Sequence, residues 1–362
     1  MTTVEGQERP VEDAAARVRT EIERAIQRNI KGLEFLSAGP QAVGAMEREL
    51  IYRRGTALLY RYVPVRDEVY RVPLLMVTPP SNHGYIFDLA KGQSMIEYLL
   101  HRGFDVYLLD WAVPTPDEAG LTLADYAEGF VADSIAEVLA ATGEDELTLA
   151  GYCMGGTLSV MHAALNPVNP IRNLVAFATP VDFTQMELFQ TWADRSHFDV
   201  DKMVDSLGVI PGDVMLGAFD LMRPANRAAG RIHLWTNMWN DEFVRSYRMF
   251  DRWAAETLPV PGEYFREQIK LLIWENALLE GKLTMRGRTA DLRNIKAATL
   301  SIVAQHDHVV SREAATPLIT RTSSTDTAEI VAKGGHVSLV AGTQALHRLW
   351  PKIDEWLRTR SL

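Results

Sequence analysis

Strand-like and helix-like patterns alternate along much of this 362-residue chain, from about residue 52 to residue 180. Apolar runs such as RVPLLMV and FDVYLLDW are typical of buried strands, and the segments between them have apolar residues at helical spacing. Strands that alternate with helices form a mostly parallel sheet with helices on its faces. The alternation therefore predicts an α/β fold.

The alternation stops in residues 181–292, where helical patterns and large apolar side chains dominate. Strand patterns return in ATLSIVAQHD and AEIVAKGGH, and a final helix follows. We therefore interpret 181–292 as a helical cap subdomain inserted into one core, which comprises 51–180 and 293–362. A separate carboxy-terminal domain is less favoured, because two strands follow the insert. Most tryptophans of the segment are expected in the core of the cap: Trp192, Trp235, Trp239, Trp253 and Trp274.

An amino-terminal helical segment, residues 1–50, precedes this core. Its apolar side chains recur near helical spacing, which predicts an amphipathic helix: Val18, Ile22, Ile26, Ile30 and Leu33. We favour the interpretation that this helix packs on the chain's own core. The alternative is a helix that binds a partner.

Composition narrows the possible partners and the compartment. The formal net charge of -10 argues against nucleic acid or an anionic membrane as the main partner. No apolar run is long enough for a membrane span or a signal peptide, so a cytoplasmic location is expected. One cysteine permits neither an internal disulfide nor a CxxC zinc site, and we expect no metal site.

The single cysteine, Cys153, lies in the sequence LAGYCMGGT, between a strand pattern and a helix pattern. The pattern G-x-C-x-G in this context predicts a nucleophile elbow. Gly151 and Gly155 would let the strand turn tightly into the helix, and the helix amides would favour the thiolate. The alternative is a buried, unreactive cysteine in a strand-to-helix turn.

A thiol nucleophile needs a base, and the base needs an acid that orients it. In α/β-hydrolase folds the chain order is nucleophile, acid, histidine. AQHDHVV supplies Asp307 and KGGHVSL supplies His336, each directly after a strand pattern. Asp182 is a rival acid, because it also follows a strand. An oxyanion hole would use the amide of Met154 and a second amide, from Ser81 or Asn82.

Cysteine at the elbow also indicates the reaction type. A thiolate attacks thioesters well, and exchange between two thioesters is nearly isoenergetic. Acyl transfer from a thioester is therefore favoured over hydrolysis of a lipid ester.

Several segments together resemble the catalytic subunit of polyhydroxyalkanoate synthases: TPPSNHGYIFDL, GFDVYLLDW, GYCMGGTLSVM, LVAFATPVDF, QHDHVV and GGHVSLV. The resemblance covers almost the whole chain. The chain resembles the shorter, two-subunit synthases (classes III and IV), because the extra amino-terminal region of the longer forms is absent. It implies an α/β-hydrolase fold, no cofactor, and a coenzyme A thioester as substrate.

The resemblance also implies roles for residues. Cys153 would carry the acyl group, His336 would activate it, and Asp307 would help to deprotonate the 3-hydroxyl that attacks next. His308 would lie near the substrate. Asn276, in ENALLEGKL, would contact the substrate region, although this part of the family varies.

The implied reaction polymerises (R)-3-hydroxyacyl-CoA, with 3-hydroxybutyryl-CoA expected, and releases coenzyme A. The implied partners are a second, non-catalytic synthase subunit, further copies in a homodimer or hetero-oligomer, and the polymer granule surface. Two rivals remain: a cysteine hydrolase of the dienelactone hydrolase type, and an inactive hydrolase-fold protein that binds partners at granules. Because the chain has one thiol, we favour a route that uses one cysteine per active site.

Overall fold

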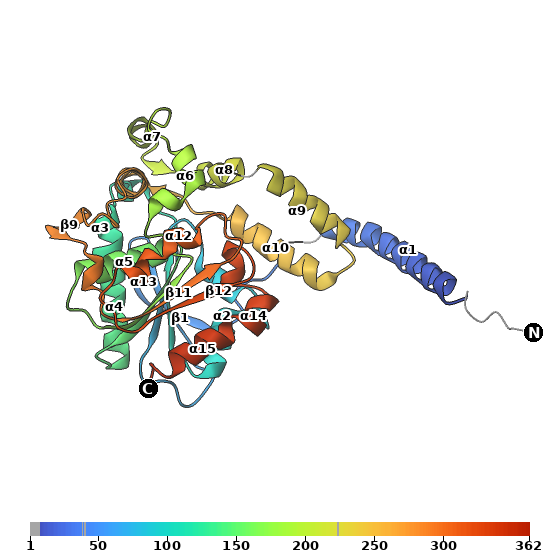
Figure 1. The fold of residues 1–362 in the computed structure, drawn as a ribbon, viewed down its shortest axis with the longest axis horizontal. Helices are drawn as coiled ribbons and strands as arrows, with labels where there is room; N and C mark the ends of the chain where they lie inside the picture. Colours follow the sequence, from blue (N-terminus) through green and yellow to red (C-terminus); the bar gives the residue numbers. More distant parts are fainter. Residues whose placement is uncertain (1–7, 38, 40, 223) are drawn as a thin grey trace, which may run out of the picture. The chain divides into compact units, whose positions relative to one another are not determined.

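A mostly parallel sheet forms the centre of the larger of two compact units in a computed structural model, which describes residues 8–37, 39, 41–222 and 224–362. Its eight strands have the order β1-β2-β4-β3-β5-β6-β11-β12 (Figure 1). The strands are β1 (Arg48–Arg54), β2 (Ala57–Tyr62), β3 (Leu74–Val77), β4 (Val106–Trp111), β5 (Leu147–Tyr152), β6 (Ile171–Phe177), β11 (Ala298–Ala304) and β12 (Thr327–Ala332). Only the pairs β1–β2 and β2–β4 are antiparallel. The predicted α/β fold is confirmed.

Helices cover both faces of this sheet, as a parallel sheet requires. Figure 1 shows α4 (Val131–Thr142) and α5 (Met154–Leu165) on one side, and α2 (Met95–Arg102), α14 (Thr343–Arg348) and α15 (Trp350–Arg358) on the other. All four residues of β3 and all six of β4 and β5 are buried, because both faces of these strands lie under helices. Strand β1 at the edge was not predicted, since its charged sequence RELIYRR lacks an apolar run.

The segment TLADYAEGFVADSIAEVLAATG predicts a long helix with Thr122 as its N-cap and Gly143 as its C-cap. This helix is present but not uniform. Thr122 caps its start in a capping box with Asp125, and Gly143 ends it with a φ of 76°. Between these ends the chain forms α3 (Leu123–Asp125), a π-helical stretch η3 (Tyr126–Phe130) and then α4. Both predicted ends are confirmed, because capping depends on local side chains.

The segment between β6 and β11 leaves the sheet and returns to it, since these two strands are parallel neighbours. Several helices of this segment belong to the same compact unit as the sheet: α6 (Glu187–Trp192), α7 (Val200–Leu207), α8 (Gly212–Met222), α11 (Gly262–Glu267) and the π-helix η5 (Gln268–Trp274). A small pairing of β7 (Val209–Ile210) with β8 (Val260–Pro261) ties its two halves together.

The second compact unit comprises residues 1–42 and 223–252, of which residues 1–7, 38, 40 and 223 lie outside the described part. It contains α1 (Glu8–Ser37), α9 (Pro224–Thr236) and most of α10 (Asp241–Ala255). The expected boundaries therefore differ from the observed units. The predicted cap 181–292 is divided between the units, and the amino-terminal segment ends at residue 42 because β1 already belongs to the sheet.

Polar and aromatic contacts join α1 to the rest of its unit. Lys31 forms an ion pair with Asp241 at 2.9 Å, and the Arg24 guanidinium lies 4.6 Å from the centre of the Trp239 ring. Arg248 lies over the ring of Phe35.

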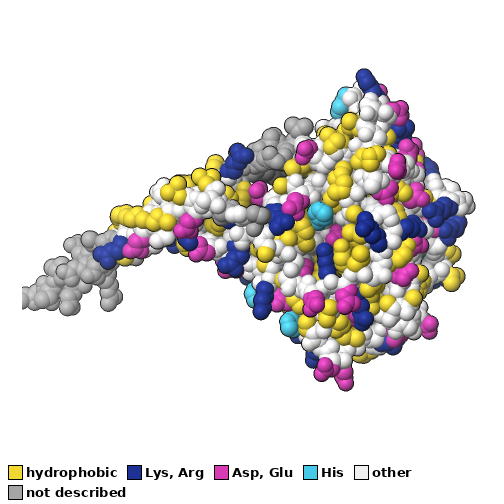
Figure 2. Space-filling model, turned by 180° about the vertical axis from the view of Figure 1, so that it is seen from behind, with side chains coloured by type: hydrophobic (Ala, Val, Ile, Leu, Met, Phe, Trp, Pro, Cys, Tyr) yellow, Lys and Arg dark blue, Asp and Glu magenta, His cyan; other side chains and the backbone are white. Residues whose placement is uncertain are grey.

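The apolar stripe of α1 is exposed, from 47% at Ile30 to 72% at Leu33 (Figure 2). That this stripe packs on the chain's own core stays a prediction, because α1 and the sheet belong to different units. None of the described helices is long and apolar enough to cross a bilayer.

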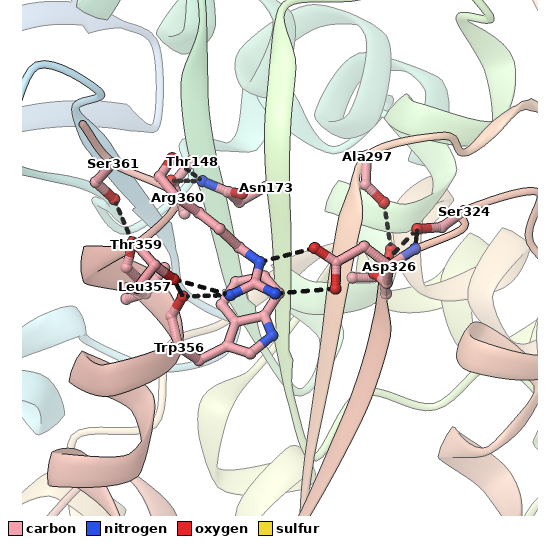
Figure 3. A network of polar contacts seen from close by, with 11 residues as sticks. Thr148, Asn173, Ala297, Ser324, Asp326, Trp356, Leu357, Thr359, Arg360 and Ser361 are labelled. Carbon is pink, nitrogen blue, oxygen red and sulfur yellow. Dashed lines mark hydrogen bonds and ion pairs between the residues drawn. The ribbon is translucent and has the colours of Figure 1, made fainter.

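A polar network closes the edge of the sheet where the parallel strands begin (Figure 3). Asp326, directly before β12, forms a bidentate ion pair with Arg360 at 2.8 and 3.0 Å. Asn173 in β6 donates to Thr148 in β5 at 2.8 Å and to the carbonyl of Arg360 at 3.3 Å. This end of the sheet has a structural role. Except for Asn276, which follows the π-helix η5, the predicted site residues follow strands at the opposite end.

Candidate active site

Cys153 lies at a sharp turn between β5 and α5. Its φ of 51° and ψ of -123° are rare for a residue with a Cβ, and such strain is common at nucleophile elbows. The Cys153 amide donates to the Phe177 carbonyl at 2.9 Å, and the Cys153 carbonyl accepts from the Thr157 amide at 3.1 Å. The neighbouring strand and the helix therefore hold the thiol at the carboxyl end of β5, where it is half-buried.

Glycines make this turn possible because neighbouring backbone leaves no space for side chains. A Cβ on Gly151 would lie 2.4 Å from the Gly156 Cα, and one on Gly155 would lie 2.3 Å from the Val77 carbonyl oxygen. Gly156, which sequence reasoning did not single out, lies against a side chain instead of backbone: its Cβ would lie 1.9 Å from the Thr179 hydroxyl oxygen. The steric role predicted for Gly151 and Gly155 agrees with these distances.

His336 and Asp307 meet at the same edge of the sheet, after β12 and β11. The Nδ1 atom of His336 lies 2.7 Å from Oδ2 of Asp307. The other carboxylate oxygen, Oδ1, accepts from the amides of Val309 and Val310 at 2.8 and 2.9 Å. The side chain of Asp307 has no exposed surface, so both of its oxygens are committed within the protein.

Charge couples these three residues. Burial lowers the pKa of His336, but the charge of Cys153, the hydrogen bonds to Asp307 and Cys153, and the charge of Asp307 together raise it to about 10. Burial raises the pKa of Asp307, but the hydrogen bond and charge of His336 and the two backbone amides outweigh it and hold that pKa below its ordinary value. The arrangement places an imidazole, oriented by a carboxylate, beside the thiol, where it can act as a base.

Asp182, the rival acid, serves another purpose. Its Oδ1 accepts from the amide and hydroxyl of Thr184 and from the side-chain amide of Asn276 at 2.9 Å. It therefore caps the short helix η4 (Phe183–Gln185), while Asp307 holds the histidine.

The predicted oxyanion donors line the same cavity as Cys153: Met154, Ser81 and Asn82. The Met154 amide is the first of α5 and so has no acceptor within the helix. The Asn82 amide donates to the Pro79 carbonyl at 3.1 Å, whereas the Ser81 amide has no such bond among the described residues. The geometry therefore favours the amides of Met154 and Ser81 as the pair, and catalytic use of either stays a prediction.

A cavity of about 450 Å³ opens over the thiol. The carboxyl-end loops form its floor with Cys153, His336 and His308, which was expected near the substrate. The inserted segment supplies mostly apolar walls: Phe183, Met186, Phe189, Met215, Leu216, Phe219, Trp253, Val260, Tyr264 and Ile273. Sequence reasoning singled out only Trp253 of this set, and expected it in the core of the cap, because an apolar side chain on a helix is equally compatible with a core position.

Asn276 does not line this cavity. It is buried with a positive φ of 48°, its Oδ1 accepts from the Phe183 amide at 2.9 Å, and its Nδ2 donates to Asp182. Both ends of its amide hold the loop that carries Phe183, and the expected contact of Asn276 with the substrate region stays a prediction. Asp307 is also absent from the lining of the cavity.

The fold and this site define an α/β-hydrolase protein with a cysteine at the nucleophile position. A family model described as "alpha/beta hydrolase fold" matches residues 82–343, and one described as "Poly-beta-hydroxybutyrate polymerase (PhaC) N-terminus" matches residues 22–99. The "Poly(3-hydroxyalkanoate) polymerase subunit PhaC" of Allochromatium vinosum is 33% identical over 91% of this chain and 94% of that protein. The chain belongs to the PhaC family of poly(3-hydroxyalkanoate) polymerases, which are acyltransferases.

Other relatives have the same name. The PhaC subunit of Thiocystis violacea is 32% identical to this chain, and the match covers 91% of this chain and 94% of the relative. The PhaC subunit of Haloferax mediterranei is 32% identical over 88% of this chain, and the match covers only 65% of that longer protein.

Solved structures show the fold alone. A monoglyceride lipase from Saccharomyces cerevisiae has a TM-score of 0.53 at 14% identity, with 89% of this chain and 96% of the lipase covered. An esterase from Thermogutta terrifontis has a TM-score of 0.52 at 17% identity, with 87% of this chain and all of the esterase covered.

Proposed function

We propose that this chain polymerises (R)-3-hydroxyacyl groups from coenzyme A thioesters into polyester, through an acyl group carried on Cys153. The observation that carries the proposal is the elbow thiol beside the His336–Asp307 pair, at the floor of a mostly apolar cavity. Membership of the PhaC family supports polyester synthesis as the reaction. The expected monomer is 3-hydroxybutyryl-CoA.

In the first step, the Cys153 thiolate attacks the thioester carbonyl carbon. A C–S bond forms to Cys153, the negative charge on oxygen is held by backbone amides, and the C–S bond to coenzyme A breaks. The proton on His336 Nε2 passes to the departing coenzyme A thiolate. His336 suits this role because its raised pKa keeps it protonated beside the thiolate at neutral pH.

In the second step, the 3-hydroxyl of an incoming hydroxyacyl-CoA attacks the acyl-Cys153 carbonyl. A C–O ester bond forms, the C–S bond to Cys153 breaks, and the hydroxyl proton passes to His336. The lengthened chain is then a coenzyme A ester, which Cys153 attacks again. This one-thiol route needs no second cysteine, and the chain has none.

His336 is the base that reaches the cavity in this scheme. Asp307 has both carboxylate oxygens in use and does not line the cavity, so we assign it the orientation of His336. This differs from the role expected from the family resemblance, in which Asp307 would help to deprotonate the hydroxyl.

Water must be kept from the acyl-enzyme, because hydrolysis would end chain growth. Apolar walls from the inserted segment suit that exclusion. We further propose that the chain acts in the cytoplasm at the surface of polymer granules, with a non-catalytic subunit and as a homodimer or hetero-oligomer.

The test is an assay of the purified chain, with and without the product of the neighbouring gene, on 3-hydroxybutyryl-CoA. Release of coenzyme A with insoluble polyester supports the proposal. Release with free 3-hydroxybutyrate instead would identify a hydrolase of the dienelactone type. No release, together with no alkylation of Cys153 by iodoacetamide at neutral pH, would favour an inactive binding protein.

A further inference from the structure

The cavity contains a polar side chain without an assigned function. Gln268 lines the cavity, is half-buried, and begins the π-helix η5. Among the residues that the structure describes, its side-chain amide has no hydrogen-bond partner. An unpaired donor and acceptor on the wall of a largely apolar cavity can form hydrogen bonds with the polar groups of a ligand that enters it.

Several other polar side chains of the lining already have hydrogen-bond partners; the side-chain nitrogen of Asn82, in the loop of the predicted oxyanion donors, is not among them. Ser81 donates to Asn82 at 3.1 Å, Thr257 donates to the Ala254 carbonyl, and Ser338 donates to the Gly335 carbonyl. Tyr152 and Tyr264 also line the cavity, but their hydroxyl oxygens are buried and have no hydrogen-bond partner among the described residues.

Contacts of residues next to Gln268 determine which face of the helical segment α11–η5 is turned toward the cavity. Glu267 accepts from the Leu123 amide at 2.8 Å, and Lys270 forms an ion pair with Asp201 at 2.7 Å. Tyr264, one turn before Gln268, lines the same cavity, so positions 264 and 268 share the inner face. A π-helical turn is uncommon and frequently marks a functional site.

Chemistry then identifies the ligand group. A 3-hydroxyacyl thioester has two oxygens on its acyl unit, the carbonyl oxygen and the 3-oxygen. The amides of Met154 and Ser81, at the elbow and the β3 loop, suit the carbonyl oxygen. The 3-oxygen is an acceptor both as a free hydroxyl and as an ester, and the Gln268 amide can donate to it in either form.

We propose that Gln268 is a specificity-determining residue that hydrogen-bonds the 3-oxygen of the acyl unit and so selects 3-hydroxyacyl over unsubstituted acyl thioesters. This inference rests on the proposed function, since it takes the thioester as substrate. A site built to hydrogen-bond a substrate oxygen discriminates against the analogue that lacks it.

The test compares two substrates on the full chain and on the variant Gln268→Met, which keeps the side-chain length and a good helix former. Rapid-quench measurement gives the first-turnover rate of coenzyme A release from 3-hydroxybutyryl-CoA and from butyryl-CoA. Butyryl-CoA can acylate Cys153 once but has no hydroxyl for growth. We expect the variant to lose about tenfold with 3-hydroxybutyryl-CoA and less than about twofold with butyryl-CoA.

The ratio of the two rates within one preparation does not depend on how much protein is folded, so partial misfolding does not obscure the result. An equal loss with both substrates would mean that Gln268 only shapes the cavity, and no loss with either would mean that it is idle. Either result overturns the inference about Gln268. It leaves the proposed function intact, provided that the wild-type chain forms polymer. A wild-type chain that releases no coenzyme A overturns the proposed function itself.

Discussion

The imidazole of His336 and the carboxylate of Asp307 are joined by a 2.7 Å hydrogen bond, although 28 residues and a strand separate them in the chain. The remaining oxygen of Asp307 is held by two backbone amides. The carboxylate therefore cannot turn away from the histidine, and it fixes the tautomer with the proton on Nδ1.

Asp307→Asn should lower the rate of coenzyme A release by about a thousandfold or more. The amides of Val309 and Val310 require an oxygen, so the Asn Nδ2 would face His336 and move its proton to Nε2. That tautomer cannot take a proton from the cavity side. The matched control is Asp182→Asn, which keeps the acceptor for Thr184 and should retain near wild-type activity. A large loss in the control with little loss in the first variant would reverse the assignment of the acid.

Cys153→Ala should lower the pKa of His336 from about 10, because the variant removes the charge and the hydrogen bond of Cys153 while burial remains. The titration of labelled histidine followed by NMR gives this value directly. An unchanged pKa in the variant would show that the thiol does not charge the imidazole.

The raised pKa of His336 also makes the free energy of unfolding depend on pH. The folded pKa of His336 is raised above its ordinary value of 6.5, so the stabilisation from its protonation is fully present below about pH 6.5. It is lost as the pH rises toward 10. The Cys153→Ala variant, compared with wild type in urea unfolding at pH 7 and pH 10, should lose less stability over this interval.

Gly155→Ala should destabilise the chain by about 3 kcal/mol and abolish activity, because the new Cβ would lie 2.3 Å from backbone of β3 that cannot move aside. The control is Gly217→Ala in α8, where nothing lies within 4 Å and alanine should stabilise the helix by about 0.5–1 kcal/mol. Urea midpoints of both variants give the comparison. Equal midpoints would mean that the elbow is not tightly packed.

Mixed dimers of wild-type and Cys153→Ala subunits should keep wild-type activity per remaining thiol. The reason is that a single cysteine suffices when the growing chain passes through a coenzyme A ester. Differently tagged subunits allow the mixed species to be purified and assayed for polymer. Complete inactivity of the mixed species would require two thiols from two subunits.

Several features could be predicted from sequence because local chemistry determines them. The alternation of apolar runs predicted the parallel sheet, and Thr122 and Gly143 marked the ends of a helix that the structure contains. The pattern around Cys153 predicted the elbow, since glycines are required wherever backbone lies within about 2.5 Å of a would-be Cβ. The order Cys153, Asp307, His336 predicted which loops would meet.

Only the tertiary structure decided how distant groups use their polar atoms. Asn276 turned out to hold the Phe183 loop, and Asp307 to bind His336 without lining the cavity. It also placed Gln268 on the cavity side of its helix, where no sequence signal distinguished it. Sequence patterns report which residues share a face of an element, whereas the partner of that face depends on contacts between segments far apart in the chain.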